Sequence, residues 1–291
     1  MRGGSKHPYI DEIICLAPLR EVFISHAKAQ RTQSLEIMLL DLQEISLAFG
    51  GLQALDQVSF GVASGTVQAV IGPNGAGKTT LFNLITGFLA PQSGKVVFQD
   101  KEIQGQPPHL VAALGIARTF QLVQLFDHMT VLENVMVGRH RLSRAGLLAG
   151  ALRLPWTREE ENSIRERALE ELAFVGLVDR ARQPAASLPL GLKRLLEIAR
   201  ALAAEPTLLL LDEPASGLDA VETERLLEMI LALRERGLTI LLVEHDMGLT
   251  MEVADQIAVL NYGQLLATGP PREVQKNPEV IAAYLGTDWQ T

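Results

Sequence analysis

Apolar and polar residues alternate along two stretches near the start of a patterned region that begins at Met38. The apolar positions are Leu40, Leu42, Ile45, Leu47 and Phe49 in the first stretch, and Val58, Phe60 and Val62 in the second. Alternation of this kind is typical of a half-buried strand, so both stretches are predicted to be strands.

From about residue 126 to 204 the spacing of apolar residues becomes helical. Thr130 with Glu133, and Thr157 with Glu160, have the spacing of capping boxes, and the second pair is expected to open a helix that runs to Val175. The apolar stripe of a further helix consists of Leu192, Leu195, Leu196 and Ala199. The shape of the segment Arg144–Trp156 is left open. We predict an inserted helical subdomain.

Strand and helix patterns alternate again from Thr207. Thr207–Leu211 and Thr239–Val243 are short apolar runs, and Ala220–Arg236 between them has a helical pattern that Gly237 closes. This alternation predicts an α/β fold with a parallel, helix-covered sheet.

Residues 1–37 lack sustained periodicity, whereas the pattern is continuous from Met38 onward. We expect residues 1–37 to be a disordered or misannotated extension and residues 38–291 to form the functional domain. The alternative is a genuine extension that packs on this domain.

Composition restricts the possible functions. The chain is 47% hydrophobic and 21% charged with a formal net charge of −8, which indicates a globular protein and argues against nucleic acid as the main partner. Cys15 is the only cysteine, so no internal disulfide can form. No apolar run approaches the ~20 residues needed to span a membrane, and no signal-peptide pattern is present.

The strongest chemical signal follows the apolar run Val67–Ile71. It fits the phosphate-binding pattern G-x-x-x-x-G-K-[ST] and consists of Gly72, Pro73, Asn74, Gly75, Ala76, Gly77, Lys78, Thr79 and Thr80. Glycines let backbone N–H groups turn toward one anion, and the following helix presents its positive N-terminal end. Lys78 is expected to reach the β- and γ-phosphates of ATP, and the Thr79 hydroxyl to bind Mg²⁺.

Asp212 and Glu213 end a buried apolar run, Leu208–Leu211, and form the second half of the predicted site. Asp212 is expected to hold Mg²⁺ directly or through water. Glu213 is expected to act as general base toward the attacking water, or to polarise that water.

With both motifs present, the chain resembles the nucleotide-binding subunits of ABC transporters over about residues 39 to 286. The resemblance implies a P-loop NTPase core, an N-terminal antiparallel β subdomain and an inserted helical subdomain. It also implies roles for individual residues. Phe49 would stack on adenine, with core packing as the alternative. Gln121 would contact Mg²⁺ or water and sense the permease. Asp219 would lie in the D-loop at the dimer interface, and His245 would contact the γ-phosphate.

The family's signature, Leu-Ser-Gly-Gly-Gln, is altered here to Leu188-Pro189-Leu190-Gly191-Leu192. Pro189 replaces the serine that donates to the γ-phosphate of the opposing subunit, and proline has neither hydroxyl nor N–H. Backbone N–H groups near Gly191 are still expected to contact nucleotide. The family works as pairs of subunits. If the partner has an intact signature, the Lys78 site is therefore expected to be the fast one and the partner's site the slow one.

Within the family, the chain is similar to ATPase subunits of branched-chain amino-acid importers. The similar segments are Gly115–Gln121, Leu125–Phe126, Met129–Asn134, Leu195–Leu202, Val243–Met247 and Asn277–Gly286. The resemblance implies two transmembrane permeases, a second ATPase (with a homodimer as the alternative) and an external solute-binding protein. It places the subunit peripherally on the cytoplasmic face of the inner membrane, while urea, amides or other small solutes remain alternative cargoes.

Coupling to the permeases would pass near Gln121. Candidate contacts are Leu122, Val123, Leu125 and Phe126, with burial between subdomains as the alternative.

Two rival functions remain. One is a soluble ABC ATPase of nucleic-acid repair or translation, which the lack of a second cassette or a coiled-coil insert opposes. The other is a regulatory subunit that binds ATP without useful hydrolysis, which the altered signature favours and the intact Lys78, Asp212, Glu213 and His245 oppose.

Overall fold

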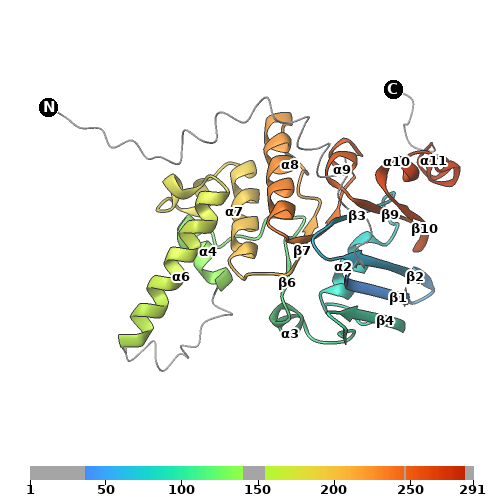
Figure 1. The fold of residues 1–291 in the computed structure, drawn as a ribbon, viewed down its shortest axis with the longest axis horizontal. Coiled ribbons are helices and arrows are strands. Elements are labelled where there is room, and N and C mark those ends of the chain that lie inside the picture. The colour runs from blue at the N-terminus through green and yellow to red at the C-terminus, as the bar shows by residue number, and fades with distance from the viewer. Residues whose placement is uncertain (1–36, 140–154, 246, 286–291) are drawn as a thin grey trace. The chain divides into compact units, whose positions relative to one another are not determined.

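A computed structural model describes residues 37–139, 155–245 and 247–285 (Figure 1). Their strands form two sheets. A four-stranded antiparallel sheet has the order β2-β1-β4-β5, and a six-stranded sheet has the order β10-β9-β3-β8-β7-β6. The first sheet contains β1 (Met38–Phe49), β2 (Leu52–Ala63), β4 (Ser93–Phe98) and β5 (Lys101–Glu102). The second contains β3 (Val67–Ile71), β6 (Ile116–Arg118), β7 (Leu208–Asp212), β8 (Thr239–Val243), β9 (Gln256–Asn261) and β10 (Gln264–Gly269).

The alternating stretches form the hairpin β1–β2, as the sequence predicts. All of the predicted apolar positions in the two strands are buried, apart from the last one in β1. Phe49 is the exception, since its exposed fraction is 50%. It ends β1 immediately before the turn at Gly50, whose φ of +60° suits glycine. The core-packing alternative for Phe49 is therefore wrong.

The central strands of the second sheet are parallel and buried on both faces. Every residue of β3, β7 and β8 is buried, which is typical of a sheet covered by helices on both sides. Leu208 and Leu210 pack into a core shared with the first sheet and the helix α2 (Lys78–Ile85). Leu209 and Leu211 face the opposite core, which holds α8 (Ala220–Glu235).

Between β6 and β7 the described elements are all helical, in agreement with the predicted insertion. They are α4 (Val131–Arg139), α6 (Pro155–Phe174), η3 (Val178–Arg180), η4 (Ala185–Ser187) and α7 (Leu190–Leu202). Figure 1 shows α4, α6 and α7 packed together to one side of the sheets. The remaining helices of the described residues are α3 (Pro108–Ala113), α9 (Met247–Val253), α10 (Pro271–Val274) and α11 (Pro278–Leu285).

Of the two predicted capping boxes, one opens a helix as expected and the other does not. Thr130 and Glu133 form the predicted capping box, because the backbone N–H of each residue donates to the side chain of the other, at 2.7 and 3.2 Å. Thr157 does not open α6, which begins two residues earlier at Pro155. Proline is favoured at the first helical position because its fixed φ suits a helix and its missing N–H would be unpaired there. The predictions for residues 1–36 and most of Arg144–Trp156 lie outside the described residues.

No helix in the described part of the chain is long and apolar enough to cross a membrane.

Candidate functional site

The phosphate-binding motif connects the end of β3 to the start of α2, in the predicted order of strand, loop and helix. Two of its glycines are required by close backbone approaches. A Cβ on Gly72 would lie 2.2 Å from the Leu260 carbonyl oxygen, and a Cβ on Gly77 would lie 2.6 Å from that of Ala54. Gly75 has open space around it, so the outer side of the loop is free to receive an anion.

Lys78 is the first residue of α2, and its side chain reaches back into this loop. Its Nζ donates to the carbonyl oxygens of Gly72, at 2.6 Å, and Pro73, at 3.1 Å. Burial lowers the pKa of Lys78 from its ordinary value, and the charges of Glu213 and Asp212 oppose this shift. The ammonium is thus held within the loop, next to two carboxylates, where phosphate oxygens could replace the carbonyls.

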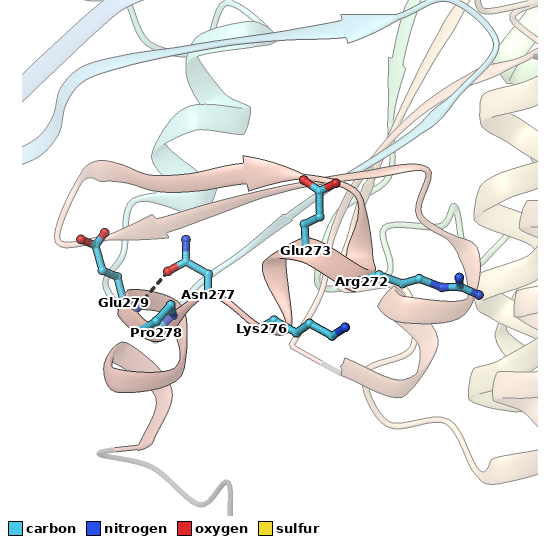
Figure 2. Close-up of a pocket in the computed structure, with 6 residues that line it drawn as sticks. All are labelled: Arg272, Glu273, Lys276, Asn277, Pro278 and Glu279. Carbon is cyan, nitrogen blue, oxygen red and sulfur yellow. Dashed lines mark hydrogen bonds between the residues drawn. The ribbon is translucent and has the colours of Figure 1, made fainter. Parts of the chain in front are cut away.

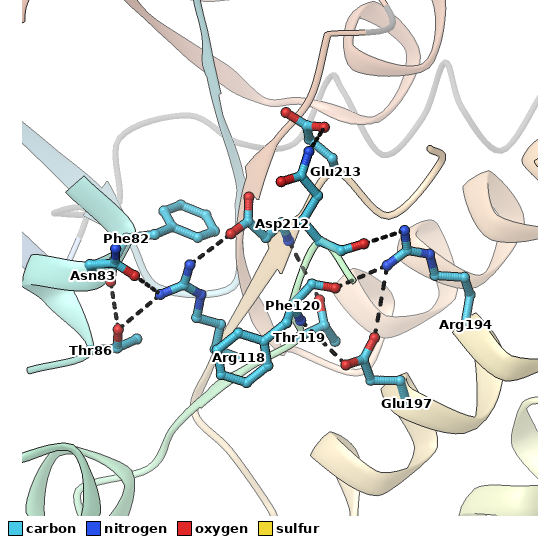
Figure 3. Close-up of polar contacts among 11 residues, drawn as sticks. Phe82, Asn83, Thr86, Arg118, Thr119, Phe120, Arg194, Glu197, Asp212 and Glu213 are labelled. Atoms are coloured by element: carbon cyan, nitrogen blue, oxygen red, sulfur yellow. Dashed lines mark hydrogen bonds and ion pairs between the residues drawn. The ribbon is translucent and has the colours of Figure 1, made fainter. Parts of the chain in front are cut away.

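Asp212 ends β7 and is buried against Arg118 from β6 (Figure 3). Arg118 Nη2 donates to Asp212 Oδ2 at 2.7 Å, and the two side chains are 6% and 5% exposed. The same guanidinium lies 5.4 Å from the ring centre of Phe82 and 5.2 Å from that of Phe120. Its Nη1 also bonds Asn83 Oδ1 of α2 at 2.7 Å. Arg118 therefore fixes one oxygen of Asp212 and leaves Oδ1 for another ligand.

Glu213, Gln121 and His245 come together although they are far apart in the sequence. Gln121 Nε2 donates to Glu213 Oε2 at 2.8 Å, and His245 Nδ1 lies 3.9 Å from the same oxygen. Glu213 has a φ of +48°, a conformation that non-glycine residues seldom adopt and that costs of order 1–3 kcal/mol. Its backbone N–H donates to Val243 O at 2.9 Å, which holds this geometry against β8.

Gly191 and Asp219 are joined through Glu222 at the starts of α7 and α8. Asp219 is the N-cap of α8 and accepts from the Glu222 N–H at 2.8 Å, while Glu222 accepts from the Asp219 N–H at 3.2 Å. A Cβ on Gly191 would lie 2.1 Å from Glu222 Oε1. Both predicted residues thus have structural contacts within the chain, and their predicted roles toward nucleotide stay predictions.

Among the other predicted residues, Asn74 and Thr79 are exposed, Pro73 and Thr80 are partly exposed and Ala76 is buried. The exposed ring of Phe49 lies where a flat ligand could reach it. Leu122 and Phe126 are 76% and 48% exposed, whereas Leu125 packs against the helical core.

More than half of the chain matches one family. Residues 55–216 match the ABC transporter family, and residues 264–289 match a family described as branched-chain amino acid ATP-binding cassette transporter. The chain belongs to the ABC transporter family.

Relatives of this cassette are similar over almost their full lengths. The high-affinity branched-chain amino acid transport ATP-binding protein LivG of Salmonella typhimurium is 44% identical, over 85% of the cassette and 98% of the relative. The corresponding protein BraF of Pseudomonas aeruginosa is 45% identical over the same shares. A crystal structure of an ABC transporter cassette in its ADP conformation has a TM-score of 0.75 and 35% identity, and covers 86% of this chain and 99% of that one. The cassette is accordingly an ATP-binding subunit of the branched-chain amino-acid group, with the P-loop NTPase fold.

Three residues that hold the site of the cassette were given no role from the sequence. Arg118 contacts Asp212, while Arg194 and Glu197 of α7 contact the segment that carries Gln121. A charged residue within an otherwise apolar strand, as in Ile116–Arg118, is a sequence signal that could have pointed to the first. The other two lie on α7 beside its apolar stripe, and nothing local distinguishes them from surface residues.

A separate hollow lies in the C-terminal segment of the cassette (Figure 2). Its lining consists of Arg272, Glu273, Lys276, Asn277, Pro278 and Glu279, in and between α10 and α11. Within it, the Glu279 N–H donates to Asn277 Oδ1 at 2.8 Å. The elements that form it contribute none of the predicted nucleotide-site residues.

Proposed function

We propose that this cassette hydrolyses ATP to power the uptake of branched-chain amino acids. The arrangement that carries the proposal is the convergence of Gln121 and His245 on Glu213, beside a P-loop whose lysine is already turned into the loop. The branched-chain cargo is supported by the names of LivG and BraF, of which the match covers 98%.

In the proposed reaction, the loop from Gly72 to Thr80 holds the phosphates through its N–H groups and Lys78. Glu213 accepts a proton from a water molecule as that water attacks the γ-phosphorus. The bond to the oxygen that bridges the β- and γ-phosphates then breaks, and ADP leaves. His245 contacts the γ-phosphate, and Gln121 orients the water through its contact with Glu213.

The side chains also fit Mg²⁺, which prefers oxygen ligands and takes one or two carboxylates together with substrate phosphates. Thr79 offers a hydroxyl, Asp212 offers Oδ1, and Gln121 offers Oε1 because its Nε2 is bonded to Glu213. When bound, the ion would neutralise charge that develops on the phosphates.

The proposed assembly contains two transmembrane permeases and a second ATPase subunit at the cytoplasmic face of the inner membrane, with an external solute-binding protein. Two ATP molecules close the pair of ATPases and hydrolysis opens it, and the difference in closure drives the permeases between two states. Within this assembly we infer that residues 38–291 form the ATPase domain and that about 126–204 form its helical subdomain. The exposed Leu122 and Phe126 are proposed permease contacts.

The first test is purification of the tagged cassette from gently solubilised membranes, with stoichiometric partners identified by mass spectrometry. We expect two permeases and a second ATPase, and ATP hydrolysis by the reconstituted complex that rises when leucine and a binding protein are supplied. Recovery as a homodimer alone, or with nucleic-acid proteins, would contradict the transporter assignment. Stimulation by another solute but not by leucine, isoleucine or valine would contradict the cargo.

A further inference from the structure

Two oppositely charged side chains of α7 are almost completely buried against the segment that carries Gln121. Arg194 and Glu197 are one helical turn apart, and their side chains are 7% and 2% exposed. Figure 3 shows both side chains pointing from α7 toward the backbone at Phe120. They belong to the helix that begins immediately after Pro189 of the altered signature.

Each side chain makes two contacts with the backbone of the Gln121 segment. Arg194 Nη1 donates to the Phe120 carbonyl oxygen at 3.0 Å, and its Nη2 donates to that of Gln121 at 2.6 Å. Glu197 Oε1 accepts from the N–H groups of Phe120 and Gln124, both at 3.4 Å. The planar guanidinium thus binds two successive carbonyls, and the carboxylate binds N–H groups on both sides of Gln121.

The segment has no regular secondary structure of its own, and at its two ends the Thr119 N–H donates to the Leu210 carbonyl of β7 at 3.0 Å and the Phe126 N–H to Asn134 Oδ1 of α4 at 2.9 Å. Residues 119–126 belong to no helix or strand, so their polar backbone groups need partners from elsewhere. The side chains of α7 supply four of these contacts, while the side chain of Gln121 reaches Glu213. The position of Gln121 relative to Glu213 therefore depends on α7.

Stability alone is a weak reason for this arrangement. Arg194 Nη1 lies 3.9 Å from Glu197 Oε2, and Arg200 Nη2 lies 3.8 Å from Glu197 Oε1. Within the described residues, Arg194 Nε and Glu197 Oε2 have no hydrogen-bond partner. Burial raises the pKa of Glu197, against the N–H groups and arginines that favour its charged form. A well-packed apolar pair is often as stable as a buried ion pair or more stable.

We propose that Arg194 and Glu197 are positioning residues that hold Gln121 against Glu213 and so link the signature helix α7 to the hydrolytic site. The inference rests on the proposed hydrolysis at Glu213 and deepens it. Because α7 starts at the signature and holds Gln121 by side chains, a displacement of this helix shifts Gln121 as well. Neither residue touches the reacting atoms; both act through Gln121.

The contact itself is tested without hydrolysis, by hydrogen–deuterium exchange of the full-length nucleotide-free chain. Arg194→Met and Glu197→Ala should each speed exchange at the backbone amides of Phe120 to Gln124. Arg139→Met is the matched control, since Arg139 of α4 donates to the Ala203 carbonyl and to Glu205, both of which lie outside this segment. Unchanged exchange in residues 120–124 with both variants, or an equal increase with the control, would overturn the proposal.

The consequence for hydrolysis is tested by a double-mutant cycle in the assembled transporter. Misplacement of a catalytic group by about 1 Å can cost ~100-fold in rate, so Arg194→Met should lower kcat by about 10- to 100-fold with little change in KM for ATP. In a Gln121→Ala background the same substitution should have almost no further effect. A merely structural role would instead lower kcat by the same factor in both backgrounds.

A folding failure and a wrong role for Gln121 can each be distinguished from failure of this proposal. If Arg194→Met fails to fold, Arg194→Lys carries the same prediction with a smaller effect, because lysine keeps the charge but cannot bind both carbonyls. If Gln121→Ala leaves hydrolysis unchanged, the proposed role of Gln121 fails, and the exchange experiment still decides whether α7 holds its backbone.

Discussion

At the end of β7, Glu213 occupies a backbone conformation that few residues adopt, and this conformation aims its carboxylate toward Gln121 and His245. The neighbouring Asp212 faces the other way, toward the buried Arg118. Two consecutive carboxylates therefore have different surroundings. One is free to exchange partners with water and nucleotide, and the other is fixed on one side, as expected for a base and a cation ligand, respectively.

Replacement of Glu213 by Gln should lower ATP hydrolysis by about 100- to 10,000-fold, the usual contribution of a general base. Nucleotide binding should remain, because the amide keeps the shape of the side chain and removes one negative charge near the phosphates. Steady-state hydrolysis and equilibrium binding of ATP measure the two effects. Glu235→Gln, on the exposed end of α8, is the control. Hydrolysis at the wild-type rate in Glu213→Gln would exclude this residue as the base.

The lowered pKa of Lys78 predicts that ATP affinity depends on pH. Phosphate oxygens raise the pKa of the ammonium on binding, so binding takes up a proton when the pH lies between the free and bound values. Affinity should fall as the pH rises through this interval. Because the pKa of Lys78 in the free protein is lowered, the fall should begin at a pH below the ordinary lysine value of 10.5. Calorimetric titration in two buffers of different ionisation enthalpy measures the uptake. In Lys78→Arg the guanidinium does not titrate, so an unchanged pH dependence would contradict the assignment.

At the scale of elements, the N-terminal ends of α7 and α8 pack against each other at the altered signature. α7 begins without a side-chain cap after Pro189, whereas α8 begins with a complete capping box of Asp219 and Glu222. The Glu222 carboxylate occupies the space where a side chain at position 191 would stand. A signature glycine thus allows the cap of one helix to pack against the start of the other.

Gly191→Ala should displace Glu222 and weaken the cap of α8. We expect a loss of about 0.5–2 kcal/mol in the free energy of unfolding, the range for loss of an N-cap. Because Glu222→Ala removes both the clash and the cap, the two substitutions should be non-additive. Denaturant unfolding of the single and double variants measures this, with Gly51→Ala as the control, because a Cβ on Gly51 would meet nothing within 4 Å and its φ is not left-handed. Additive losses would show that Glu222 does not occupy this space in solution.

At the scale of the whole molecule, the altered signature predicts two unequal sites in a pair of ATPases. In the proposed pair, each nucleotide would lie between one P-loop and the partner's signature, and Pro189 removes a donor from the signature that this cassette would supply. If the partner has the serine, the Lys78 site has the better transition-state stabilisation. The partner's site, which Pro189 and Gly191 close, is the slower one.

Disabling the two P-loop lysines one at a time in the assembled transporter tests this asymmetry. Lys78→Ala should abolish most of the hydrolysis, whereas the same change in the partner ATPase should leave a substantial part. Restoring the hydroxyl by Pro189→Ser should raise turnover at the partner's site. The measurement is single-turnover hydrolysis of each variant complex. Equal losses from the two lysine variants would contradict the prediction.

Much of the fold was predictable because its signals are local. Alternation determined β1 and β2, and apolar runs determined β3, β7 and β8. The order of strand, glycine loop and helix located the P-loop. The helix α3 and the strands β9 and β10 were not predicted, and α6 begins earlier than its capping signal suggested. The helix α3 and the strand β10 are short, and β9 is positioned by its pairing with the distant strand β3.

The sequence by itself determined which residues have the chemistry for nucleotide binding: Lys78 and Thr79 after a strand, and Asp212 and Glu213 at the end of another. Only the tertiary structure decided how these residues are held. Gln121 bonds Glu213 across 92 positions, Arg118 bonds Asp212 across 94, and Arg194 bonds the Phe120 carbonyl across 74. The physical reason is that backbone periodicity depends on neighbours in the chain, whereas the partner of a buried charge depends on which strands and helices pack side by side.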